Sequence, residues 1–137
     1  MRIAILSASV LLLTACSSGP TTEVVNSELQ HHHWTLSAID GVAIASDIKS
    51  DLEIAEHFTI NGLAGCNRFF GSARVEKNRL IADPLATTMM ACSPAEQVVE
   101  QAVLETLGKG ATINNQGTEL TLTGDQHTLT YTLADWM

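Results

Sequence analysis

The stretch that decides the fold is residues 119–133, which reads ELTLTGDQHTLTYTL. On both sides of Gly124-Asp125, apolar residues alternate with threonine, so an extended chain would carry its apolar side chains on one face. Gly-Asp pairs favour tight turns. The pattern therefore predicts a β-hairpin, and a two-residue loop would place Leu120 opposite Leu129.

The same period-two alternation predicts shorter strands upstream, and three turn signals lie among them. These strands contain Trp34 to Ala38, Leu52 and Ile54, Phe58 and Ile60, Val75, and Leu80. The turn signals are Asp40-Gly41, Asn61-Gly62 and Lys77-Asn78, of which the second ends its strand. Gly62, Gly65 and Gly71 suit tight bends or bulges. We expect these segments to form an antiparallel sheet.

One segment has the pattern of a full helix, and it begins at Ser93. The order Ser93-Pro94-Ala95-Glu96 is a capping box with proline at the first helical position. An apolar stripe follows, and Gly108 is the expected stop. The stripe consists of Ala95, Val98, Val99, Ala102 and Val103, with Leu107 at its margin. One helix packed on an antiparallel sheet is an α+β fold.

The amino terminus has the order and length of a secretory signal peptide. Arg2 supplies a positive charge, and residues 3–13 are apolar apart from two serines. This run is too short to span a bilayer, which takes about 20 residues. It ends in Leu13-Thr14-Ala15-Cys16, which resembles the lipobox of bacterial lipoproteins. We therefore expect cleavage before Cys16 and acylation of that residue.

This interpretation divides the chain into a signal peptide (1–15), a lipidated tether (16–30) and one domain (31–137). Residues 17–26 are mostly small and polar, which suits a flexible tether. Two or three acyl chains on Cys16 would hold the protein on a membrane through lipid. The residue after Cys16 is Ser17 and not an aspartate. This resembles the sorting pattern of outer-membrane lipoproteins in Gram-negative bacteria. We expect an outer-membrane anchor that faces the periplasm.

Composition narrows the classes of function. The 137 residues include 7 Lys or Arg and 15 Asp or Glu, for a formal charge of −8, and 45% are hydrophobic. One ordinary domain is expected at this length. The charge argues against a nucleic-acid partner, because phosphate binding needs clustered cations. The apolar share is too high for a disordered chain.

The residues that bear reactive groups do not complete a recognised catalytic or metal motif. In His31-His32-His33, adjacent strand side chains point to opposite faces, so at most two could converge on a metal ion. No second cluster has the spacing of metal ligands, and neither a phosphate loop nor a Gly-x-Ser-x-Gly motif occurs. We expect no metal, no other cofactor and no enzymatic activity.

Two cysteines remain once Cys16 is assigned to acylation. In an oxidising envelope compartment, Cys66 and Cys92 are expected to form a disulfide. A reactive or redox-cycling thiol is the alternative. It is weaker because the sequence has no Cys-x-x-Cys motif.

The blocks around these cysteines resemble the META domain family. They are GCNRFFG at 65–71 and LATTMMAC at 85–92, followed by HTLTYTLAD at 127–135, and the resemblance covers residues 31–137. It implies an α+β fold with a strongly curved antiparallel sheet, pairing of Cys66 with Cys92, and a role in heat or envelope stress. It carries over no catalytic residue.

The same blocks supply the candidate binding residues. Asn67, Arg68 and Phe69 are a possible ligand-binding loop, and Met89 and Met90 are expected to fill irregular gaps in the core. We expect a lipid-anchored, non-enzymatic envelope protein that binds or shields an unknown envelope protein or small ligand. A thiol- or ligand-dependent enzyme and a periplasmic inhibitor or chaperone module remain alternatives.

Overall fold

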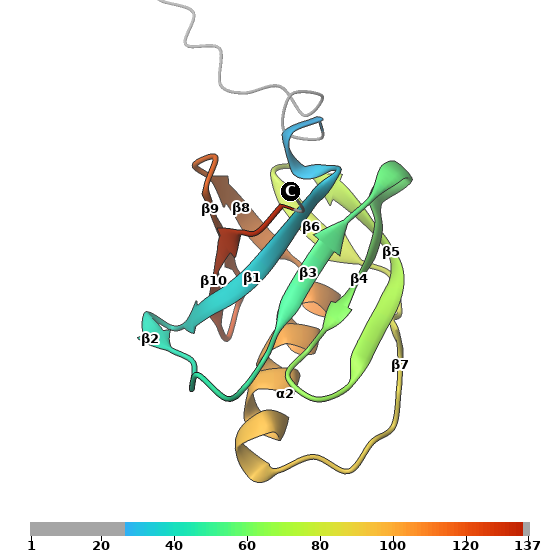
Figure 1. Ribbon diagram of the computed structural model, residues 1–137. Coiled ribbons are helices and arrows are strands. Elements are labelled where there is room, and N and C mark those ends of the chain that lie inside the picture. The colour runs from blue at the N-terminus through green and yellow to red at the C-terminus, as the bar shows by residue number, and fades with distance from the viewer. Residues whose placement is uncertain (1–26, 136–137) are drawn as a thin grey trace, which may run out of the picture.

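The computed structural model describes residues 27–135. Its strands are β1 (His32–Ile39), β2 (Val42–Ala43), β3 (Asp51–Ile54), β4 (Thr59–Leu63), β5 (Arg68–Glu76), β6 (Arg79–Ala82), β7 (Ala86–Thr87), β8 (Ala111–Asn115), β9 (Glu119–Thr123) and β10 (Thr128–Leu133). A 3₁₀ turn, η1 (Glu56–Phe58), precedes β4, and helix α2 (Pro94–Lys109) lies between β7 and β8 (Figure 1).

Eight antiparallel strands close into a barrel. Their order is β1-β3-β4-β5-β6-β8-β9-β10, and β10 pairs again with β1. The closing register places Trp34 opposite Leu133 and Leu36 opposite Tyr131. Of the two remaining strands in the described part, β2 pairs with β1 and β7 pairs with β5. The expected α+β fold, a curved sheet with a helix packed on it, is therefore wrong.

The reason for this correction is that closure depends on a contact between distant segments. Trp34 and Leu133 are almost the whole domain apart in sequence, so no local pattern reports their pairing. Alternation of apolar and polar residues looks the same in a barrel wall and in an open sheet with one covered face. The sequence thus predicts the strands but leaves the closure undetermined.

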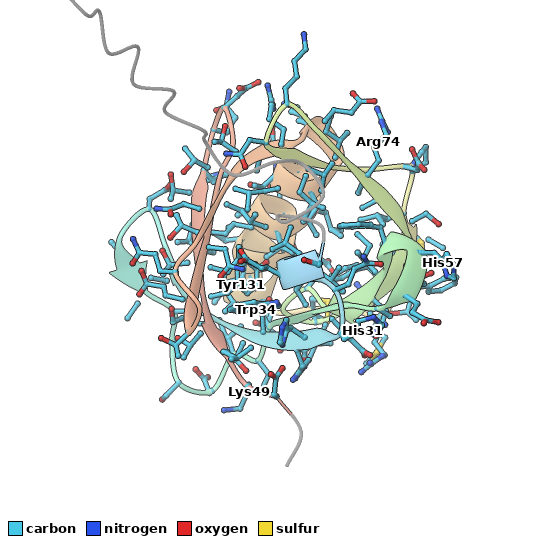
Figure 2. All side chains as sticks on the ribbon, turned by 90° about the horizontal axis from the view of Figure 1, so that it is seen from above. His31, Trp34, Lys49, His57, Arg74 and Tyr131 are labelled. Carbon is cyan, nitrogen blue, oxygen red and sulfur yellow. A yellow bond between two sulfur atoms is a disulfide. The ribbon has the colours of Figure 1, made fainter. Side chains whose placement is uncertain are left out.

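The core fills the space between the barrel wall and α2. Its largest fully buried side chains are Trp34, Tyr131, Phe69, Leu29, Leu52, Ile54, Ile60, Leu80, Leu107, Leu120, Leu122 and Leu129. Seen from above, the strands surround the helix (Figure 2). The buried face of α2 is rotated from the expected one, because Leu107 is fully buried and Val98 is 68% exposed.

The start of α2 follows the predicted capping box, which is confirmed. The Ser93 Oγ atom accepts a hydrogen bond from the backbone N–H of Glu96, and the Glu96 carboxylate accepts one from the N–H of Ser93. The predicted stop at Gly108 is wrong, because the helix continues to Lys109 and Gly110 is its C-cap. Gly110 has φ 89° and donates its N–H to the Thr106 carbonyl.

The β9–β10 hairpin forms as predicted, but with a different loop. Leu122 faces Leu129, and Leu120 faces Tyr131, so the pairing of Leu120 with Leu129 is wrong. The loop has four residues and is closed by a hydrogen bond from Gly124 N–H to the His127 carbonyl. Because the slip is two residues, every side chain keeps its expected face.

The sequence predicts that this strand ends at the turn signal Asn61-Gly62, but strand β4 does not end there. It runs on to Leu63, and Gly62 lies against the neighbouring strand β3. A β-carbon at Gly62 would come within 2.1 Å of the Asp51 carbonyl oxygen. This glycine therefore serves a close approach between backbones and not a turn.

The predictions for residues 1–26, including the signal peptide and Cys16, lie outside the described residues. The described part begins at residue 27, and Leu29 is already fully buried. No helix within residues 27–135 has the length and apolarity needed to cross a membrane.

Candidate binding groove around Asn67

A disulfide joins Cys66, just before β5, to Cys92, just before the N-cap of α2. The two Cα atoms are 5.9 Å apart, and the residues are separated by 26 positions in sequence. The Glu96 carboxylate lies close to both sulfurs, within 4.8 Å. The disulfide occupies both sulfurs, so this cluster lacks the free thiolates that a metal would need.

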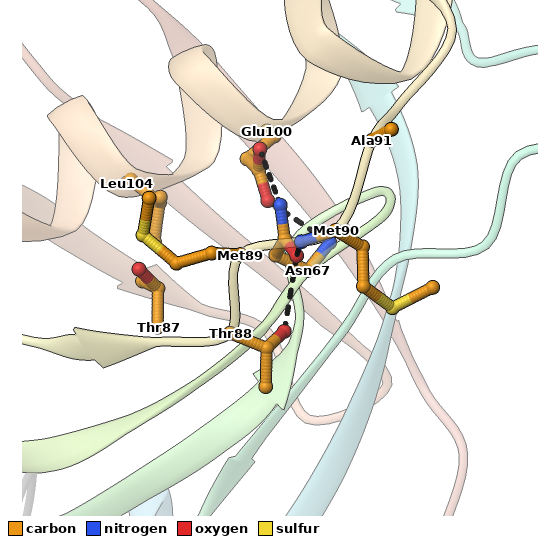
Figure 3. A pocket seen from close by; sticks show the side chains of 8 residues that line it. All are labelled: Asn67, Thr87, Thr88, Met89, Met90, Ala91, Glu100 and Leu104. Carbon is orange, nitrogen blue, oxygen red and sulfur yellow. Dashed lines mark hydrogen bonds between the residues drawn. The ribbon is translucent and has the colours of Figure 1, made fainter.

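Asn67 is the polar centre of the segment that the disulfide holds in place. The residue is 7% exposed, and its backbone N–H donates to Glu100 Oε1 at 2.9 Å. Its side-chain Nδ2 lies 3.3 Å from Glu100 Oε2 and 3.4 Å from Cys92 Sγ. Through these contacts Asn67 links β5 to α2 (Figure 3).

The carbonyl oxygen of the same side chain holds the segment after β7. Asn67 Oδ1 accepts hydrogen bonds from the Thr88 hydroxyl at 3.1 Å and from the Met90 N–H at 2.6 Å. The Thr88 hydroxyl oxygen in turn accepts the N–H of Arg68. One buried amide therefore fixes three segments: the start of β5, residues 88–90 and α2.

Two adjoining hollows lie beside this centre. The first, of about 470 Å³, is lined by Asn67, Thr87, Thr88, Met89, Met90, Ala91, Glu100 and Leu104. The second, of about 290 Å³, is lined by Ala82, Asp83, Pro84, Leu85, Thr87, Leu104 and Gly108. Because Thr87 and Leu104 line both, we describe them as one groove between residues 82–91 and α2. On the helix side it follows Glu100, Leu104 and Gly108, which share one face at a spacing of four.

The methionines beside the groove do not fill the core, so that expectation is wrong. Met89 is 93% exposed and Met90 is 65% exposed. Phe70 on β5, which pairs with Ala86 of β7, is 58% exposed. The hydrogen bond from Met90 N–H to Asn67 holds this backbone at the surface. Three large apolar side chains thus face solvent near the groove.

The three residues of the candidate loop have different positions. Asn67 lines the groove, whereas Phe69 is 1% exposed and belongs to the core. Arg68 begins β5 with an exposed side chain. Sequence reasoning missed Glu100 and Thr88. Glu100 and Thr88 are 33 and 21 positions from Asn67, so no local pattern indicates these contacts. The one available sequence signal was the four-residue spacing of Glu100 and Leu104, which places them on the same face of the helix.

Comparison with known proteins identifies the fold and its relatives. The model of the META domain matches residues 27–136. The chain belongs to the META domain family. It is 33% identical to the heat shock protein HslJ of Escherichia coli K12, over 99% of this chain and 98% of that protein.

Two solved structures resemble this META domain. An NMR structure with 34% identity superposes with a TM-score of 0.72 and covers 81% of this chain and 96% of its own. An NMR structure of a protein from Burkholderia xenovorans, 25% identical, has a TM-score of 0.66 over 98% of this chain and 99% of its own. The fold therefore recurs along nearly the whole length of its relatives.

The groove of this META domain is acidic. The charged residues among those that line it are Glu100 and Asp83. Arg74 pairs with Asp83 at 2.9 Å and with Glu76 at 3.0 Å. The Glu100 carboxylate accepts hydrogen bonds from the backbone and side-chain amides of Asn67, which are neutral. The groove thus contains one carboxylate without a cationic partner among the residues described.

The histidine triplet lies at the start of β1, far from the groove in sequence. His32 Nδ1 is 2.8 Å from an Asp135 carboxylate oxygen. His33 Nδ1 is 3.2 Å from the Ala134 carbonyl, and its Nε2 is 3.6 Å from Asp51 Oδ2. The pKa of Asp135 is lowered, first by the hydrogen bond from the His33 N–H and then by His32. These contacts tie the two ends of the domain together.

Proposed function

We propose that this META domain protein is a lipid-anchored, non-enzymatic protein of the bacterial cell envelope whose groove binds or shields a partner during heat or envelope stress. The observation that carries the proposal is the exposure of Met89 and Met90, at 93% and 65%, beside an acidic groove. Large apolar side chains gathered at a hollow are typical of binding surfaces.

The orientation of the domain supports this assignment. Residue 27 and the start of β1 lie at one end of the barrel, whereas the segment before α2 lies at the other (Figure 1). A tether from Cys16 would therefore join the domain at the end opposite to the segment before α2, which leaves that segment free to meet a partner. The lipobox-like sequence before Cys16 and the Cys66–Cys92 disulfide both fit an oxidising envelope compartment.

Binding is favoured over catalysis by the chemistry of the site. The disulfide takes up the two cysteines of the domain, which a thiol enzyme would need as free nucleophiles. Among the alternatives, an inhibitor or chaperone module gains support from the exposed apolar side chains of Phe70, Met89 and Met90. An inhibitor and a chaperone both act by binding another molecule, so either one would be compatible with this groove.

In-cell photocrosslinking tests this proposal. A photoreactive residue at position 89 is expected to give a reproducible adduct in heat-stressed cells. The same probe at position 42, where Val42 is 71% exposed on the other short strand, is the matched control and should give none. Equal adducts at both positions, or no adduct at position 89, would contradict a partner at the groove.

A further inference from the structure

The short strand β7 has an open edge whose orientation is fixed by one hydrogen bond. The Thr88 N–H donates to the Arg68 carbonyl at 3.0 Å, and the Arg68 N–H donates in return to the Thr88 hydroxyl, so the backbone N–H of Thr88 points toward β5. In the β5–β7 register, Thr87 lies opposite Phe69, one position further along. Because antiparallel ladders alternate, the N–H and C=O of Thr87 point away from β5.

This edge opens onto the groove. Thr87 lines both hollows, and Leu104 of α2 lines both from the opposite side. The barrel wall itself has no edge, because its eight strands close on one another. Unpaired strand edges accept another polypeptide backbone, so natural proteins usually cover or blunt them. Here the open edge lies beside apolar side chains and a hollow.

The negative charge of the groove narrows the class of partner that it can bind. Glu100 lacks a cationic partner among the described residues, whereas Asp83 pairs with Arg74. The whole chain carries a formal charge of −8. A partner segment with basic side chains would complement this groove, and an acidic one would be repelled.

We propose that the groove binds an extended basic polypeptide segment by strand addition to β7. The backbone of that segment pairs with Thr87, its apolar side chains contact Leu104, and a lysine or arginine lies near Glu100. This inference rests on the proposed function and names the class of partner. Strand addition uses main-chain hydrogen bonds for affinity and alternate side chains for specificity.

The dimensions of the groove suit a short segment. Glu100 and Gly108 are eight positions apart on α2, which corresponds to about 12 Å along the helix axis. An extended chain advances about 3.3 Å per residue, so about four residues span this distance. The bound motif is therefore short.

A pair of proline variants separates strand addition from simple adsorption. Thr87→Pro removes an N–H that β5 does not use, which edge strands tolerate. Ala43→Pro is the matched control on β2, because the hydrogen bond from Ile44 N–H to the Ser37 carbonyl turns the Ala43 N–H outward in the same way. Circular dichroism and thermal melting verify that both variants fold.

The probe is a synthetic peptide of ten alternating lysine and valine residues, with its binding to the oxidised protein measured by calorimetry. We expect wild type and Ala43→Pro to bind it equally, and Thr87→Pro to bind about tenfold more weakly. Peptides with backbone N-methylation, or with glutamate in place of lysine, should not bind. Equal binding by folded Thr87→Pro, equal binding of the glutamate peptide, or no binding by wild type would overturn strand addition. The crosslink at position 89 would still report separately on whether this face binds a partner.

Discussion

The Nδ1 atom of His127 lies 2.8 Å from the Asp40 Oδ2 atom, and this contact joins the end of β1 to the start of β10. The other oxygen of Asp40 accepts the N–H of Thr128 at 2.8 Å. At the opposite end of the same strand pair, Asp135 accepts hydrogen bonds from His33 and contacts His32. A carboxylate thus fastens each end of the seam that closes the barrel.

The seam predicts how stability depends on pH. The pKa of Asp40 is lowered from 3.8, first by the hydrogen bond from His127 and then by that from Thr128. A folded-state pKa below the unfolded value favours folding above the unfolded value, and this contribution is lost as the pH falls through the folded one. We therefore expect the free energy of unfolding, measured with urea, to fall below about pH 4.

The variant Asp40→Asn is expected to weaken that dependence on pH between 5 and 2. Asp47→Asn, at an exposed position in the loop before β3, is the matched control. If both variants lose stability with pH as steeply as the wild type does, Asp40 has no part in the acid response.

Asn67 is expected to be the most sensitive polar position of the groove. Asn67→Ala removes the acceptor for Thr88 and Met90 and one donor to Glu100. We expect a loss of about 1–3 kcal/mol in the free energy of unfolding by urea, because several partly buried groups lose their hydrogen-bond partner at once. Asn114→Ala, at an exposed position of β8, should change stability by less than about 0.5 kcal/mol. A similar small change at Asn67 would refute its role as a structural centre.

The disulfide should contribute to stability through the chain that it closes. Cys66 and Cys92 are separated by 26 positions. Replacing both by alanine is expected to lower the free energy of unfolding by roughly 3.5 kcal/mol in the loop-entropy model. Reduction of the wild type should give a similar loss in the same urea titration. Unchanged unfolding of the reduced protein would exclude this contribution.

Two glycines predict opposite responses to the same substitution. Gly62→Ala would place a β-carbon 2.1 Å from the Asp51 carbonyl oxygen, so we expect destabilisation of about 3 kcal/mol or more. At Gly108 in α2, an added β-carbon meets nothing within 4 Å outside its own helix backbone, so alanine should stabilise by up to about 1 kcal/mol. Thermal melting of both variants distinguishes them, and shifts of the same sign would be inconsistent with this packing.

Local features of the fold are the ones that the sequence predicts well. The cap at Ser93 and Glu96 involves residues three positions apart, and the β9–β10 hairpin involves a short loop. The barrel closure between Trp34 and Leu133 and the link from Asn67 to Glu100 join distant segments. Such contacts depend on the whole chain, so local periodicity does not report them.

The methionines illustrate the same limit at the groove. Apolar character predicted burial for Met89 and Met90, but the Asn67 side chain holds the Met90 backbone where both side chains face solvent. The apolar character of a side chain indicates that burial is favourable. Here the hydrogen bond from the Met90 N–H to Asn67 fixes the course of the backbone instead. The exposed pair became visible only with the structure.

The anchor predicts a clear result in cell fractionation. Cys16→Ala removes the sulfur that would carry lipid, so we expect unprocessed protein or release from the membrane fraction. Ser17→Asp is the matched variant, which should stay lipidated but move from the outer to the inner membrane. Membrane association of Cys16→Ala equal to that of the wild type would argue against a lipid anchor.

The intact mass of the protein extracted from membranes tests the central claim most directly. A lipid-anchored envelope protein should begin at residue 16 and carry the added mass of two or three fatty acyl chains. A chain that retains Met1 and has no fatty adduct would contradict the account.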